Sequence, residues 1–117
     1  MAAVTCKASV RLKGITPALL RILQGVYTVS RVLTEPPTVV ITSINDSQHS
    51  PTSRHYRDEA VDLRSKSFPS PAAKSLFATA LRAELGPAFT VLYEGADTPN
   101  EHWHVQVRKG TSYPGQA

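Results

Sequence analysis

Hydrophobic positions along the chain repeat with two periods, one typical of helices and the other of strands. A Thr-Pro pair at 16–17 supplies an N-cap residue followed by proline, and apolar residues then predict a helix over 17–33. A Glu-Pro-Pro stretch at 35–37 ends it. A Ser-Pro pair at 70–71 repeats the start signal, and Gly-Pro at 86–87 ends the apolar stripe that follows. The pattern therefore predicts two main helices.

Short β-branched or alternating runs predict four strands. These runs are 38–44, 59–64, 89–94 and 101–107. Apolar residues at even positions within 1–14 indicate a further short strand or an ordered arm. Because only residues 95–100 separate the last two strands, we expect these strands to pair antiparallel.

The predicted elements describe an α+β domain. We expect a small antiparallel sheet with both main helices packed on one face. A single domain over 1–117 would have its core at about 15–108, an N-terminal arm at 1–14 and a tail at 109–117. The polar connection at 45–58 is long for so small a domain, and such loops are usually functional or disordered.

Composition narrows the class of protein. The chain has 117 residues, and no apolar run approaches the roughly 18–20 residues of a membrane span. The single Cys6 excludes an intramolecular disulfide, and small domains without disulfides often use a bound metal instead. The first residues lack a charged region followed by an apolar one, so we expect no signal peptide and synthesis in the cytoplasm.

The net charge of +4 favours a polyanionic partner. Nucleic acid, an anionic cell wall and a membrane surface all fit that description. The basic residues are spread along the chain, however, so a solvated basic surface is the simplest interpretation. Nucleic-acid binding rests on the isoelectric point of about 9.5 alone, and we do not expect it.

Two predicted strands place metal-ligating residue types on one face. His102 and His104 alternate with Trp103, so the imidazoles lie opposite an apolar face. Asp62 occupies the polar face of the 59–64 strand in the same way. Two strands that turn their apolar sides to one core must turn these polar sides to a common outer groove, so we expect a zinc site on the sheet face opposite the helices. Strict alternation would turn Glu101 toward the core, unless that residue belongs to the preceding loop.

Three nitrogen or oxygen ligands with an open fourth position are typical of catalytic zinc. His55, Asp62 and His104 can supply such a set. A carboxylate beside it can act as general base on a water molecule, and Glu101 is the candidate.

These residues carry a resemblance to a known family. The segment Ser53-x-His55-x4-Ala60-x-Asp62, followed by Glu101-x-x-His104, resembles the zinc D-Ala-D-Ala peptidase family (M15 type), which shares its fold with the amino-terminal domain of hedgehog proteins. The similarity covers roughly 17–108. It implies that His55, Asp62 and His104 bind zinc and that Glu101 is the general base. It also implies substrate or oxyanion contacts for Ser53 and His102.

The sequence departs from the family pattern at two places. Asp58 stands where relatives have glycine. Relatives also carry a Gly-Tyr-Arg type turn after the first buried strand, whereas residues 44–47 here contain no arginine. Arg54 and Arg57 are the candidates to replace that substrate-binding arginine.

The resemblance implies a zinc metallopeptidase that hydrolyses peptide bonds of peptidoglycan stem peptides. It would be of the D,D-carboxypeptidase or endopeptidase (endolysin) type. We expect a phage-encoded monomer that is released or carried to an anionic cell wall. The missing arginine motivates an alternative, a zinc-stabilised binding or structural module without catalytic turnover.

Overall fold

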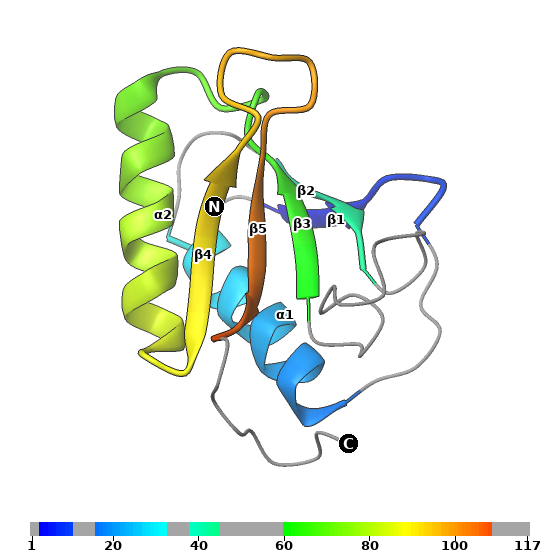
Figure 1. The fold of residues 1–117 in the computed structure, drawn as a ribbon, viewed down its shortest axis with the longest axis vertical. Helices are drawn as coiled ribbons and strands as arrows, with labels where there is room; N and C mark the ends of the chain where they lie inside the picture. Colours follow the sequence, from blue (N-terminus) through cyan, green and yellow to red (C-terminus); the bar gives the residue numbers. More distant parts are fainter. Residues whose placement is uncertain (1–2, 11–15, 33–37, 45–59, 109–117) are drawn as a thin grey trace.

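The computed structural model describes residues 3–10, 16–32, 38–44 and 60–108. Within these ranges, five strands form one sheet with two helices (Figure 1). In chain order the elements are β1 (Ala3–Cys6), α1 (Pro17–Ser30), β2 (Thr38–Ser43), β3 (Ala60–Arg64), α2 (Pro71–Leu85), β4 (Phe89–Glu94) and β5 (His102–Val107).

The sheet is mixed, with the strand order β1-β2-β3-β5-β4. β1 and β2 are parallel, and the other three neighbouring pairs are antiparallel. The α+β class is confirmed, but the prediction of a purely antiparallel sheet is wrong. The reason lies in the connection: α1 stands between β1 and β2 in the chain, and a crossover helix returns the next strand in the same direction.

Both helices begin where the capping signals predict. The hydroxyl of Thr16 accepts a hydrogen bond from Leu19 N at 3.1 Å, and the hydroxyl of Ser70 accepts one from Ala73 N at 3.1 Å. α1 ends at Ser30, before the predicted end at residue 33. Val32 is 78% exposed, so burial no longer supports a helix beyond that point.

α2 ends at Leu85 and is capped by Gly86, whose φ of 80° lies in the left-handed region that favours glycine. Its buried face consists of Phe77, Ala78, Leu81 and Leu85. Leu76 of the same helix is 64% exposed.

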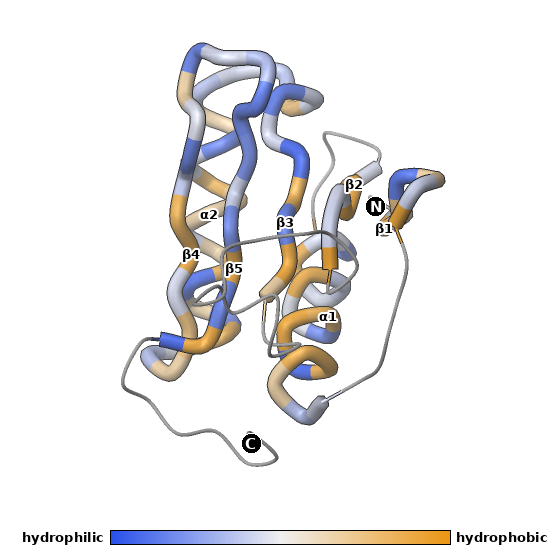
Figure 2. The backbone as a smooth tube through the Cα atoms, turned by 45° about the vertical axis from the view of Figure 1, so that its right-hand side comes forward, coloured by the Kyte–Doolittle hydropathy of each residue, from blue (hydrophilic) through white to orange (hydrophobic). Residues whose placement is uncertain are grey.

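One cluster of buried side chains joins both helices to one face of the sheet. At its centre the Trp103 ring lies 4.9 Å, between ring centroids, from both Phe68 and Phe77. Figure 2 shows hydrophobic residues along α1 and hydrophilic ones in the connection between β4 and β5. We call the sheet face opposite the helices the open face. It carries Thr42, Asp62, Arg64, His102, His104 and Gln106, all only partly buried.

No helix in the described part of the chain is long and apolar enough to cross a membrane.

Candidate functional site

Asp62 and His104 are direct partners on the open face. They lie opposite each other in the antiparallel pairing of β3 with β5. His104 Nδ1 lies 2.9 Å from Asp62 Oδ1, and the two side chains are 13% and 15% exposed. The expectation that these two strands turn their polar sides to a common face is confirmed.

The surroundings of His104 favour its protonated form. Burial of the imidazole lowers the pKa of His104, but the hydrogen bond and negative charge of Asp62 act in the opposite direction. Gln106 adds a further hydrogen bond, with its Oε1 2.7 Å from His104 Nε2. The net result is a pKa of His104 above its ordinary value.

The side chains of this pair suit zinc, which takes imidazole nitrogen and carboxylate oxygen as ligands. Within the described ranges, no group of three His, Cys, Asp or Glu side chains is placed to hold a metal ion. The third predicted ligand, His55, lies outside the described residues, as do Ser53, Arg54, Arg57 and Asp58. The structure therefore brings together two of the three predicted ligands.

Glu101 lies in a different environment. It directly precedes β5, and its side chain is 8% exposed. Its carboxylate accepts hydrogen bonds from Ser65 Oγ at 2.6 Å and from Lys74 Nζ at 2.9 and 3.0 Å. The hydroxyl of Tyr93 also donates to it. We call these four residues the Glu101 network.

The Glu101 network strongly favours the ionised carboxylate. The hydrogen bond from Ser65, followed by those from Tyr93 and Lys74, lowers the pKa of Glu101 to about 2. The positive charge of Lys74 acts in the same direction, whereas burial opposes it. In this arrangement the carboxylate is a weak proton acceptor.

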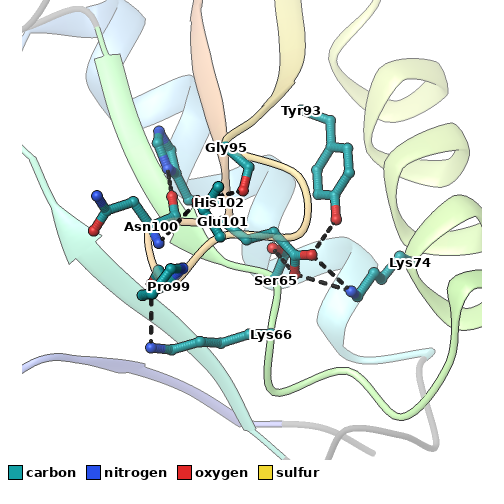
Figure 3. A network of polar contacts seen from close by, with 10 residues as sticks. Ser65, Lys66, Lys74, Tyr93, Gly95, Pro99, Asn100, Glu101 and His102 are labelled. Atoms are coloured by element: carbon teal, nitrogen blue, oxygen red, sulfur yellow. Dashed lines mark hydrogen bonds and ion pairs between the residues drawn. The ribbon is translucent and has the colours of Figure 1, made fainter.

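The Glu101 carboxylate and the His102 ring extend in opposite directions (Figure 3). Glu101 lies with Trp103 on the side of the helices, where Lys74 of α2 and Tyr93 of β4 contact it. His104 lies on the open face with Asp62. The structure thus separates the predicted base from Asp62 and His104, as strict strand alternation requires, although Glu101 itself precedes the strand.

His102 belongs to the open face and is opposite Arg64 in the pairing of β3 with β5. Its Nδ1 lies 2.5 Å from the carbonyl oxygen of Asn100, which only accepts, so this ring nitrogen is the donor. Its Nε2 lies 3.1 Å from Glu94 Oε1. These two contacts fix the orientation of the ring beside the Asp62–His104 pair.

Sequence reasoning missed Arg64 and the partners of Glu101. Alternation in the 59–64 strand places Arg64 on the same face as Asp62, but no motif assigned Arg64 a role in the site. No comparable signal links Ser65, Lys74 and Tyr93 to Glu101, because these contacts join segments that are distant in sequence.

No protein-family model, curated protein or solved structure matches the chain.

Proposed function

We propose that the protein is a zinc-dependent peptidase that hydrolyses peptide bonds of peptidoglycan stem peptides, with His55, Asp62 and His104 as ligands. The observation that carries this proposal is the Asp62–His104 pair on the open face. His55 precedes β3 by only five residues, a length of chain that spans at most about 18 Å. Zinc bound there would polarise the scissile carbonyl and lower the pKa of water to about 7.

The chain's own residues would handle the proton. Glu101, as general base, would take a proton onto its carboxylate and pass it to the leaving amine. Ser65, Lys74 and Tyr93 hold the pKa of that carboxylate at about 2. To act as base, the carboxylate would have to leave these three hydrogen-bond donors and turn toward the open face. His102, with Ser53, Arg54 or Arg57, would position the substrate.

Digestion of purified peptidoglycan by the zinc-loaded protein tests this function. We expect mass spectrometry to detect new peptide termini with the wild type, and Glu101→Gln to lower the rate at least about 100-fold. Glu84→Gln is the matched control, because Glu84 pairs with Arg21 on the helix side, and should retain activity. A zinc-loaded wild type that releases nothing would exclude the peptidase, and full activity of Glu101→Gln would exclude Glu101 as base.

The Glu101 network favours a second candidate function. A carboxylate that is engaged by three donors away from the Asp62–His104 pair suits a zinc-stabilised binding or structural module. Such a module would bind zinc and wall fragments without producing new amine termini. Fragment binding and amine release, measured on the same sample, distinguish the two functions.

A further inference from the structure

We propose that a cationic groove beside the Asp62–His104 pair binds a carboxylate of the substrate peptide; this inference rests on the proposed peptidase function. The groove has a volume of about 530 Å³. We define it by Lys7, Arg64, Lys66, Asn100 and His102, all of which line it together with Asp62.

Strand register places the groove next to the candidate site. Arg64 lies opposite His102, one step along the open face from the Asp62–His104 pairing. Two residues of a strand span roughly 7 Å, so the Cα atoms of Asp62 and Arg64 are about that far apart. Lys7 lies at the same end of the sheet, next to β2. Its backbone N–H donates to the carbonyl of Ile41 at 2.8 Å, and Ile41 lies opposite Leu63, the residue before Arg64.

The charges of the groove favour an anion. Lys7, Arg64 and Lys66 contribute three cations, whereas Asp62 is paired with His104. Glu101 also lines the groove, but its carboxylate is held by Ser65, Lys74 and Tyr93. Lys66 donates to the carbonyl of Pro99 at 3.3 Å (Figure 3).

The side chains of Arg64 and Lys7 form no hydrogen bond or ion pair with any other residue in the described ranges. Both cations are therefore available to a ligand as far as this part of the chain is concerned. They lie on β3 and directly after β1, so they approach the groove from separate strands.

A carboxylate is the anion that this geometry suits. The planar guanidinium of Arg64 pairs with a carboxylate through two parallel hydrogen bonds, and Lys7 adds a second positive charge. An extended peptide rises roughly 3.3 Å per residue, so a carboxylate within about two residues of the scissile bond would reach Arg64. A peptidoglycan stem peptide with L-Lys at its third position offers two, the α-carboxylate of γ-linked D-Glu and the C-terminus.

The test uses three versions of the stem pentapeptide L-Ala-γ-D-Glu-L-Lys-D-Ala-D-Ala. One is unmodified, one is amidated at the D-Glu α-carboxylate, and one is amidated at the C-terminus. Calorimetric titration of the zinc-loaded full chain at 5 °C gives the affinities, and mass spectrometry checks that each peptide stays intact. We expect one of the two amidated peptides to bind the wild type about tenfold more weakly than the unmodified peptide. Arg64→Gln should bind the unmodified peptide and that amide equally.

Arg31→Gln is the matched control, because it removes one positive charge beside Tyr27 at the end of α1 and should keep the discrimination. Lys7→Gln should reduce the discrimination less than Arg64→Gln, and it provides a second variant if Arg64→Gln fails to fold. Equal binding of all three peptides by the wild type, no binding at all, or full discrimination by Arg64→Gln would overturn the inference. Peptide binding is read independently of cleavage, so discrimination without hydrolysis would refute the peptidase but not the groove.

Discussion

At the scale of single residues, the Glu101 network shows how one carboxylate can be buried in its charged form. An ionised carboxylate with 8% exposure requires donors to replace the water it has lost. Ser65, Lys74 and Tyr93 supply these donors from three separate parts of the chain. The same contacts that make Glu101 stable in this position make it a weak base there.

We predict that Glu101→Gln lowers the free energy of unfolding by about 1–3 kcal/mol at pH 7, because it leaves Lys74 without its charged partner. The pKa of Glu101 is depressed on folding, so this stabilisation is present above pH 4.5 and is lost as the pH falls toward about 2. Urea unfolding at pH 7 and at pH 3 measures the difference between wild type and variant, which should narrow at the lower pH. Tyr93→Phe removes only one donor and should lower the free energy of unfolding less than Glu101→Gln does. Equal stabilities of wild type and Glu101→Gln at both pH values would contradict the prediction.

Zinc binding should depend on His104 and on pH. The ligand form of His104 is neutral, and its raised pKa means that protons compete with the metal. We predict that zinc affinity, measured by calorimetry, falls at least about tenfold between pH 7.5 and pH 5.5. His104→Ala should abolish binding, whereas His102→Ala, on the same strand face, should retain it. Loss of zinc in both variants, or in neither, would argue against the predicted ligand set.

At the scale of elements, α1 and α2 approach closely at one glycine. A Cβ atom added to Gly25 would lie 2.5 Å from Cδ2 and 3.1 Å from Cγ of Leu85. Leu85 is buried at the end of α2, so it has little space in which to move. The residue that weakens α1 by about 1 kcal/mol in helix propensity therefore permits the contact between the helices.

We predict that Gly25→Val lowers the free energy of unfolding by about 1–3 kcal/mol, because its side chain overpacks this contact. Leu85→Ala alone should also destabilise, through the cavity it leaves. The double variant, compared with both single variants by urea unfolding, should lose less than the sum of the two. Strictly additive losses would show that the two positions do not compete for the same space.

Local signals in the sequence predicted much of the fold. Thr16 and Ser70 marked the helix starts because capping acts within one turn. Alternation placed Asp62 and His104 on one face because side-chain direction in a strand has a period of two. The parallel pairing of β1 and the partners of Glu101 depend on contacts between distant segments, which no local pattern specifies. The role of His55 as a zinc ligand stays a prediction.

At the scale of the whole molecule, the core formed by the described residues lies on the helix side of the sheet. The opposite side holds the Asp62–His104 pair and the cationic groove. One cysteine allows no disulfide within the chain, so a bound metal would add a further link between β3 and β5, besides their backbone pairing and the Asp62–His104 contact.

We predict that zinc stabilises the entire domain. A ligand that binds only the folded state at 1,000 times its Kd adds about 4 kcal/mol to the free energy of unfolding. Thermal unfolding should therefore have a higher midpoint with zinc, and a chelator should reverse the shift. In the double variant Asp62→Asn/His104→Ala, zinc should leave the midpoint unchanged. A wild-type midpoint that does not respond to chelator would contradict this prediction.

The separation of 42 positions between Asp62 and His104 in the sequence also governs when a metal site can exist. β5 is synthesised after β3, α2 and β4, yet it lies between β3 and β4 in the sheet. On the ribosome, therefore, β3 and β4 both emerge before the strand that joins them. Asp62 has no His104 beside it until β5 inserts, so metal capture by this pair must follow translation of nearly the whole domain.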